Sequence, residues 1–450
     1  IDTIRSVDQN CLITAHSAGA HTINRMVEGA DDVWRAAEKV QIYGFGGGAC
    51  LDAPTSWRTW LVPDLVRSAC EGKKFWMAEA PSGPNFRPAQ HTPPWMAPQP
   101  AKTPRHVGRV PTDADLRLWD MSCFAAGASG HYCNRVRPLM DGPLFGSAGA
   151  YAMDGSRTPR SEMWKKMALW ANAPRQVPMW QSRPLPGEAA ILFVPDSQVY
   201  CTAFNGSSQL YAGAVHGAYQ GFFDQNIQVE FAKIHQIDKY KVLYAPYPVF
   251  LPSNIVAELI AWVEKGGILI SEGCPGYFDE TGKAGLVQPN HGLDRVFGCR
   301  ESYVEFLPDL AEDEIVRMSN GTQIWGGAYV QQYRLQGGVA VGHYADGSVA
   351  AVENGYGKGK ALLIGTGFGL GYSKHRDADG AAFFRALWAW TGQTQHITCN
   401  APHVTARLHT GAAGTYLWVS NPHFTAMAVE LGFSRAWGPF TGAETVWGEE

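Results

Sequence analysis

The 450-residue sequence lacks several features that mark whole classes of protein. It contains no apolar run near the roughly 20 residues that a membrane-spanning helix requires. It also contains no cluster of lysine and arginine of the kind that binds nucleic acid. Its formal net charge of −4 does not favour a polyanionic partner. We therefore expect neither a membrane nor a nucleic acid as a partner.

Paired cysteines are also missing. The nine cysteines are scattered, none forms a CxxC motif, and their number is odd. This pattern favours free thiols in a reducing, cytoplasmic compartment over a disulfide framework, and it predicts neither a metal site nor a bound cofactor. The sequence begins at Ile1 rather than at methionine, so its first residues say little about a signal peptide.

The sequence is rich in glycine and tryptophan. Hydrophobic residues make up 45% and charged residues 17%, and there are 50 glycines and 16 tryptophans. This composition is typical of a globular protein, and the length predicts two or three domains. Glycine-rich loops with tryptophans suit sugar binding, because an indole face stacks on a pyranose ring. Ordinary core packing explains most of the tryptophans equally well.

Residues 1–173 alternate between strand and helix patterns. Four β/α units in a row predict parallel strands, and four units amount to half of a (β/α)8 barrel with open edges. Two long loops, 81–111 and 137–157, follow the last two strands, where such barrels build their active sites. The predicted strands are 12–16, 40–45, 74–80 and 131–136, and the predicted helices are 56–70, 113–126 and 159–171, with a less certain helix within 23–39.

Two further domains are predicted. A proline-rich linker at 174–186 leads to apolar strands at 189–194, 242–245, 268–271 and 361–365, with an amphipathic helix at 252–265. This is the pattern of a flavodoxin-like parallel sheet. From about residue 396, apolar and polar residues alternate around turns, which is typical of a small antiparallel β-domain. The fold class is therefore α/β, with domains at 1–185, 186–395 and 396–450.

Glu79 is the strongest candidate for catalysis. It is the only acidic residue within 1–185 that closes an aromatic-apolar strand, KKFWMAEA. Retaining glycosidases need one carboxylate as a nucleophile and a second carboxyl group as general acid and base. A carboxylate at the end of a buried barrel strand destabilises the fold unless it takes part in catalysis or forms an ion pair. A catalytic role and a buried ion pair both satisfy this argument.

The residues around Glu79 resemble the nucleophile segment of glycoside hydrolase family 42, the β-galactosidase type. Met77 stands one residue further from the glutamate than is usual in that family. The resemblance implies that Glu79 is the nucleophile of a retaining enzyme and that Trp76 and Asn85 bind substrate. The matching residues are Phe75, Trp76, Met77, Glu79, Ser82, Gly83, Asn85 and Phe86.

Other segments resemble the same family, and they occur along the chain in the same order as in that family. LITAHS and VQIYGF take the places of the fifth and sixth barrel strands, and the run ending HYCNRVR resembles the last helix and strand. Its arginines, Arg135 and Arg137, are implied substrate contacts, and either is a candidate for keeping Glu79 ionised. The second domain resembles the family's trimerisation domain, which implies a homotrimer with a carbohydrate substrate. The tail resembles its small C-terminal β-domain.

Two departures from the family bear on function. The family carries its acid/base glutamate in an Asn-Glu pair, and no such pair occurs in this sequence. The sequence thus predicts that the first half of the barrel is missing and that this chain alone is inactive. Val136 stands where the family has a tryptophan, and PLMDGPLFG replaces a Glu/His region that contacts galactose. β-Galactosides and related β-glycosides both remain as substrates.

Several other residues are candidate substrate contacts, and each also has a purely structural explanation. Tyr43 ends a predicted strand and either lines the site or packs in the core. Asp141 either binds a sugar hydroxyl or forms a turn. The long loop carries three possible lid residues, His91, Trp95 and His106.

Two other classes of function stay open. One is a non-catalytic carbohydrate-binding or assembly protein. The other is an amidotransferase-like enzyme that uses Cys274, although Glu272 occupies a position where a nucleophile elbow needs a small residue.

Overall fold

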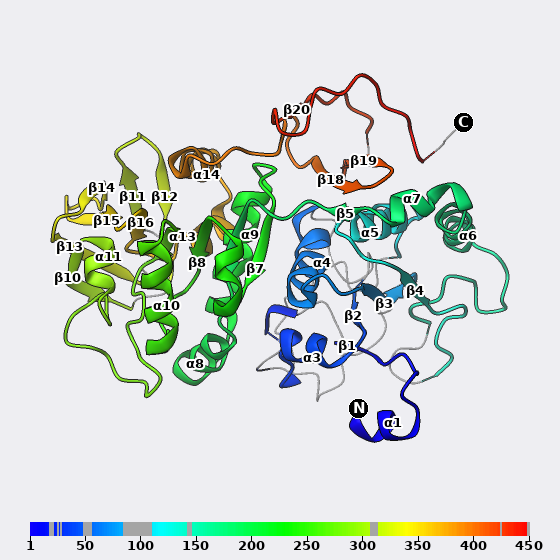
Figure 1. Ribbon diagram of the computed structural model, residues 1–450, viewed down its shortest axis with the longest axis horizontal. Helices are drawn as coiled ribbons and strands as arrows, with labels where there is room; N and C mark the ends of the chain where they lie inside the picture. Colours follow the sequence, from blue (N-terminus) through cyan, green and yellow to red (C-terminus); the bar gives the residue numbers. More distant parts are fainter. Residues whose placement is uncertain are drawn as a thin grey trace.

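The computed structural model describes residues 1–17, 22–24, 27, 29–47, 56–83, 110–141, 146–306, 314–423 and 425–447. Figure 1 shows two α/β bodies side by side, with the C-terminal strands lying across the top of the N-terminal body. The N-terminal body holds the first four strands and the middle body holds the large sheet.

The N-terminal body contains a four-stranded parallel sheet in the order β1-β2-β3-β4. The predicted parallel β/α arrangement is confirmed for these strands. Its elements are α1 (Asp2–Val7), β1 (Thr14–Ser17), η1 (Thr22–Asn24), α3 (Val33–Lys39), β2 (Ile42–Gly46), α4 (Ser56–Cys70), β3 (Phe75–Pro81), α5 (Asp113–Ala125), β4 (His131–Asn134) and α6 (Pro159–Ala171).

Local sequence signals explain where two of these helices begin. The side chain of Thr158 accepts a hydrogen bond from the backbone of Ser161, and Pro159 occupies the first turn of α6. Thr112 and Asp115 form a reciprocal capping box at the start of α5. The predicted starts at residues 113 and 159 are confirmed.

The middle body is built on an 11-stranded mixed sheet. Strands β7, β6, β8, β9 and β16 form its parallel part, and all of these except β7 were predicted. The antiparallel extension formed by β10 to β15 was not predicted. The strands are β6 (Ala189–Leu192), β7 (Val229–Ala232), β8 (Val242–Ala245), β9 (Ile268–Glu272), β10 (Cys299–Glu305), β11 (Ile315–Met318), β12 (Gln323–Trp325), β13 (Val330–Leu335), β14 (Val339–His343), β15 (Val349–Tyr356) and β16 (Gly359–Ile364).

Helices cover both faces of the parallel part of this sheet. Every residue of β6, β8 and β9 is buried. Residues of α9, α13 and α14 pack on one face, and residues of α10 and α11 pack on the other. The helices are α8 (Pro195–Asn205), α9 (Gln209–Phe223), η3 (Ile234–Lys239), α10 (Ser253–Glu264), α11 (Leu293–Phe297), α13 (Phe368–His375) and α14 (Ala378–Thr391).

The C-terminal strands are antiparallel, as predicted. β18 pairs with β19 and also with β5, a short strand contributed by the linker. β17 pairs with β20. These elements and the linker helices are η2 (Pro174–Gln176), α7 (Val177–Trp180), β5 (Arg183–Pro184), β17 (Ile397–Cys399), β18 (Thr405–Gly411), β19 (Gly414–Ser420) and β20 (Leu431–Phe433).

A buried polar network ties the three parts together at α4. The carboxylate of Asp64 is fully buried and accepts hydrogen bonds of 2.6 Å from Arg67 and from the Tyr219 hydroxyl of α9. Arg407 of β18 lies 3.8 Å from the same carboxylate. A buried charge that lost these partners would be costly. The network therefore fixes the N-terminal sheet against the other two parts.

Candidate functional site

The most informative irregularity of the N-terminal sheet is a β-bulge in β3. Phe45 pairs with Met77, but the next residue, Gly46, pairs with Glu79 rather than Ala78. The register against β4 shifts across the same segment. A bulge inserts one residue into a strand and re-aims the side chains that follow it. The bulge accommodates the extra residue that separates Met77 from Glu79 in this sequence.

The bulge decides which face of the sheet carries Glu79. Simple alternation from Met77, which is fully buried, would return residue 79 to the buried, helix-covered face. Instead Glu79 pairs with Gly46, two residues after Gly44, whose position lies against Trp76 and Ala78. Trp76 and Glu79 therefore share the inner face, which is the face directed away from the helices.

Two side chains from other strands of the sheet hold the Glu79 carboxylate. Asn134 at the end of β4 donates a 2.8 Å hydrogen bond from Nδ2 to Oε1. His16 of β1 places Nε2 3.5 Å from Oε2. The side chains of His16 and Glu79 are 41% and 42% exposed, so the pair stays open to solvent. The carboxylate is thus oriented on both oxygens while remaining accessible to a ligand.

Two buried polar atoms lie beside this carboxylate. Trp76 Nε1 and Asn134 Oδ1 have no hydrogen-bond partner within the described part of the chain. One is a donor and the other an acceptor. The ring of Tyr132, which is 62% exposed, meets Trp76 edge-on at a centroid distance of 6.1 Å.

The helix-covered face contains different groups. Tyr43 is only 2% exposed, packs in the hydrophobic core and lies 3.4 Å from Asp31, so it does not line the inner face as predicted. The physical reason is strand alternation, because its neighbour Gly44 faces inward. On the same covered face, His131 lies 3.0 Å from the buried carboxylate of Asp120. Burial raises the pKa of Asp120, and His131 opposes that rise.

The other predicted contacts do not meet Glu79. Arg135 and Arg137 are exposed, and among the described residues the ionic and hydrogen-bonding partners of Glu79 are His16 and Asn134. The Arg137 guanidinium lies beside Gly155 instead. Asp141 is exposed in the segment after β4. Asn85, His91, Trp95 and His106 lie outside the described residues.

The alternative site around Cys274 is sealed. Cys274 follows β9 and is fully buried, and burial raises the pKa of its thiol well above the ordinary value. Its backbone amide donates a 2.7 Å hydrogen bond to Gln331. A thiolate is the form that attacks a carbonyl, and this environment disfavours it. The geometry therefore gives no support to an amidotransferase reaction.

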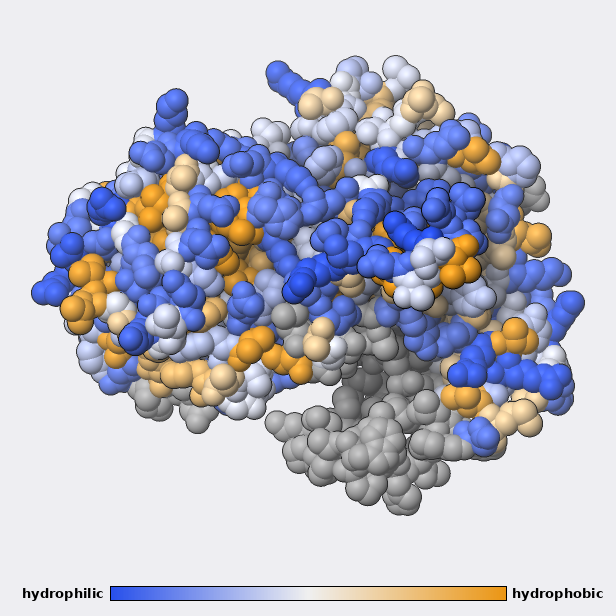
Figure 2. Space-filling view, turned by 60° about the horizontal axis from the view of Figure 1, so that its bottom comes forward, coloured by the Kyte–Doolittle hydropathy of each residue, from blue (hydrophilic) through white to orange (hydrophobic). Residues whose placement is uncertain are grey.

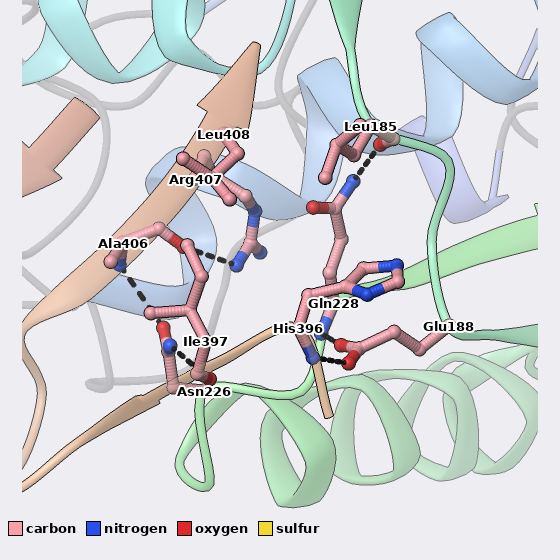
Figure 3. Close-up of a pocket in the computed structure, with 9 residues that line it drawn as sticks. All are labelled: Leu185, Glu188, Asn226, Gln228, His396, Ile397, Ala406, Arg407 and Leu408. Atoms are coloured by element: carbon pink, nitrogen blue, oxygen red, sulfur yellow. Dashed lines mark hydrogen bonds between the residues drawn. The ribbon is translucent and has the colours of Figure 1, made fainter. Parts of the chain in front are cut away.

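A small cavity lies where the linker, the middle body and the C-terminal strands meet (Figure 3). Glu188 accepts backbone hydrogen bonds there from His396 and Gln228, and burial raises its pKa to about 7. The volume of about 10 Å³ suits one water molecule. The cavity is lined by Leu185, Glu188, Asn226, Gln228, His396, Ile397, Ala406, Arg407 and Leu408.

The described residues contain no cluster of histidine, cysteine or acidic side chains suited to a metal ion. Within the same residues no helix has both the length and the apolarity to cross a membrane. Eight of the nine cysteines are described and are free thiols, as expected, and Cys50 lies outside the described residues.

Comparisons with known proteins agree with this architecture. A family model for the beta-galactosidase trimerisation domain matches residues 187–394. Beta-galactosidase BgaB of a Geobacillus species is 23% identical over 264 residues, covering 56% of this chain. Beta-galactosidase LacZ of Heyndrickxia coagulans is 24% identical over 262 residues. Together these matches support a family of the glycoside hydrolase 42 type.

Solved structures share the fold of this chain. A catalytic mutant of Gan42B, a GH42 beta-galactosidase from G. stearothermophilus, superimposes with a TM-score of 0.75 at 18% identity. That match covers 92% of this chain but 59% of Gan42B, and the alignments with BgaB and LacZ each cover 38% of those proteins. The chain thus spans less than two thirds of the relatives it matches.

Sequence reasoning missed two residues of the site, His16 and Asn134. Both are polar residues near the carboxyl end of a strand, which is the criterion that selected Glu79. Extending that criterion from acidic to all polar residues would have found them. The β-bulge has a weaker signal, namely the single extra residue between Met77 and Glu79.

Proposed function

We propose that this chain is the nucleophile-bearing part of a retaining family 42 glycoside hydrolase that acts on β-galactosides or related β-glycosides. The observation that carries the proposal is the placement of Glu79. It ends β3 on the open inner face, half-exposed, with its two oxygens oriented by Asn134 and His16. A structural carboxylate has no need of that exposure, whereas a nucleophile requires it.

The proposed reaction is a double displacement. A Glu79 oxygen attacks the anomeric carbon as the glycosidic bond breaks, while a second carboxyl group protonates the leaving oxygen. The same group then takes a proton from a water molecule, which attacks the anomeric carbon, breaks the bond to Glu79 and leaves the configuration retained. Retention requires the two carboxyl groups to stand roughly 5–5.5 Å apart. No described carboxylate of this chain contacts Glu79.

We infer that further β/α units complete the barrel and supply the acid. Among the described strands, β1 and β4 each have one neighbour in the sheet, so both are edges. The segment before β1 exposes Ile4, Val7 and Leu12 at 50%, 87% and 76%, and α1 contains no buried residue. Apolar side chains of this kind are expected where another layer packs.

The inner face supports a sugar as the substrate. Trp76 and Tyr132, whose rings meet edge-on, offer aromatic surface there. The names of BgaB and LacZ favour a β-galactoside. Arg135, Arg137 and Asp141 follow β4 directly and stay candidate contacts to the sugar, as does Asn85.

Trapping the covalent intermediate tests this function. The complete enzyme is incubated with a 2-deoxy-2-fluoro-β-galactoside, and the labelled peptide is identified by mass spectrometry. We expect the label on Glu79 and retained configuration in the product of an unmodified substrate. A label on another carboxylate would reject the assignment. Binding of galactosides with no turnover by the complete enzyme would instead favour a non-catalytic carbohydrate-binding protein.

We also propose a homotrimer formed through the middle body. On the face shown in Figure 2, hydrophobic residues gather in several small groups over this body, between hydrophilic ones. A ring cluster of Tyr200, Phe204, Phe278 and Phe306 is a candidate contact surface. Phe204 is 50% exposed, although its ring packs on its neighbours.

Light scattering tests the assembly. We expect a mass near three times that of the 49.1 kDa chain. Phe204→Asp places a charge in the proposed contact and should shift the mass toward the monomer. Phe440→Asp is a matched control, because Phe440 is similarly exposed at 48% but lies in the C-terminal segment. A monomeric wild-type protein would contradict the trimer, and a trimeric Phe204→Asp protein would contradict this contact surface.

A further inference from the structure

His16 reaches Glu79 across an intervening strand. His16 belongs to β1 and Glu79 to β3, and β2 lies between them. Neighbouring strands stand about 4.8 Å apart, so the two backbones are separated by about twice that distance. The Nε2 to Oε2 distance is nevertheless 3.5 Å. The contact therefore needs a free path over the surface of β2.

Gly44 provides that path. It pairs with His16 on one side and with Trp76 on the other. A Cβ atom at Gly44 would lie 2.6 Å from the Cβ of Ala78, 2.8 Å from the Cβ of His16 and 2.9 Å from Trp76 Nε1. Contacts this short do not occur between real side chains. Any residue other than glycine at 44 would displace at least one of these groups.

We propose that His16 is a positioning residue for the nucleophile, and that Gly44 is the gap through which it acts. Asn134 fixes Oε1 of Glu79, and His16 fixes Oε2. With one oxygen held from each side, the carboxylate keeps one orientation while its remaining lone pairs face the open side. The inference rests on the proposed function, because it takes Glu79 as the nucleophile.

The first experiment requires no catalysis and uses the 450-residue chain. Diethyl pyrocarbonate modifies imidazole nitrogens that carry a free lone pair, and mass spectrometry reports the rate for each histidine. The Glu79 carboxylate lies 3.5 Å from Nε2 and shields that nitrogen from the reagent, so Glu79→Ala should raise the modification rate of His16 at Nε2 severalfold. His235 is the internal control. It forms a remote surface pair with Glu71 at 3.1 Å and should react at the same rate in both proteins.

The second experiment measures glycosylation of Glu79 by the 2-fluoro sugar in the complete enzyme. His16→Ala should slow the labelling step by roughly tenfold to a hundredfold, with little change in sugar affinity, because misplacing a reacting group costs rate rather than binding. His16→Gln keeps an N–H donor of similar reach and should recover most of the rate. His235→Ala is the matched control and should label like the wild type.

A structural role would give a different result. His16 is 41% exposed, so we expect His16→Ala to melt at the wild-type temperature. If the Gly44→Ala protein folds, it should label as slowly as His16→Ala. If it does not fold, His16→Ala still tests the inference. Normal labelling by His16→Ala, or an unchanged modification rate in Glu79→Ala, would overturn the inference. Protection of His16 without any labelling of the wild type would uphold the contact and reject the proposed function.

Discussion

Two glutamates end parallel strands in this chain, and their surroundings differ. Glu79 closes β3 with its side chain 42% exposed. Glu272 closes β9 with no exposure, and it accepts hydrogen bonds from the Tyr244 hydroxyl and from the backbone amides of Tyr247 and Gly369. Glu79 has one hydrogen bond and one longer ionic contact. A glutamate near the end of a parallel strand is therefore open to solvent in one sheet, at Glu79, and part of a buried hydrogen-bond network in the other, at Glu272.

The sheets around these residues explain the difference. Helices cover both faces of β8 and β9, which leaves no access to Glu272. The inner face of β1 to β4 has no such cover among the described residues, and it carries Trp76 and Tyr132 in place of small aliphatic side chains. Position at a strand end is thus a weak indicator of function. Exposure together with unfilled hydrogen-bonding capacity is the stronger one.

Replacing each glutamate by glutamine should separate the two roles most strongly. In the complete enzyme, Glu79→Gln removes the proposed nucleophile and should lower turnover by at least about a thousandfold, roughly 4 kcal/mol of transition-state stabilisation. Its melting temperature should stay near the wild-type value, because the swap is nearly isosteric and the site is solvated. Initial rates on an aryl β-galactoside and a thermal melt measure both effects.

Glu272→Gln should lower stability rather than turnover. Its amide nitrogen cannot accept a hydrogen bond, so one backbone donor loses its partner and the melting temperature falls. Turnover of the folded fraction should be unchanged. Full activity in Glu79→Gln, or catalytic loss in a stably folded Glu272→Gln, would contradict the assignment of roles.

Expressing the two sheets separately should sharpen the contrast between them. The middle segment, residues 186–395, has a sheet covered on both sides and should fold as a cooperatively melting unit. Residues 1–185 have two open edges, exposed apolar residues before β1 and a buried network that needs Tyr219 and Arg407. We expect this segment to aggregate. A monodisperse, cooperatively melting preparation of 1–185 would show that the N-terminal sheet needs no further strands.

Much of the fold was predictable because its signals are local. The helices at 56–70 and 159–171 were predicted with the bounds that the structure gives, and Thr158 and Pro159 mark the start of the second. The strands were predicted within two residues at most ends. The antiparallel strands from β10 to β15 were missed, because their pairings join residues far apart in sequence. Their short mixed patterns carry no comparable local signal.

The site was predictable only in part. Glu79 and Trp76 were selected from one strand, yet strict alternation would put them on opposite faces. The β-bulge brings them together. Tyr43 does not reach the inner face. No bulge precedes it in β2, so strand alternation turns its side chain into the core. Contacts between strands, such as His16 to Glu79, depend on a glycine whose role is visible only once three strands are aligned.

The smallest expected effect is a pH dependence of stability that Glu272 introduces. Burial raises the pKa of Glu272 from 4.5 to about 7, and its three hydrogen-bond donors oppose that rise. The unfolded chain therefore loses this proton near pH 4.5, whereas the folded chain keeps it until about pH 7. In this window the folded state binds more protons than the unfolded state. The contribution of Glu272 to the free energy of unfolding is therefore fully present below pH 4.5 and declines as the pH rises through 7. The decline amounts to on the order of 3 kcal/mol.

Urea unfolding from pH 4.5 to 8 in the wild type, Glu272→Gln and Glu79→Gln measures this effect. Each glutamine variant lacks one titrating carboxyl group, so the difference in slope between it and the wild type isolates that group, whatever the offset in stability. We expect Glu272→Gln to lose the decline and Glu79→Gln to keep it, because Glu79→Gln leaves Glu272 in place. Equal slopes in all three proteins would mean that Glu272 is ionised in the folded state, with its three donors outweighing the desolvation that burial imposes.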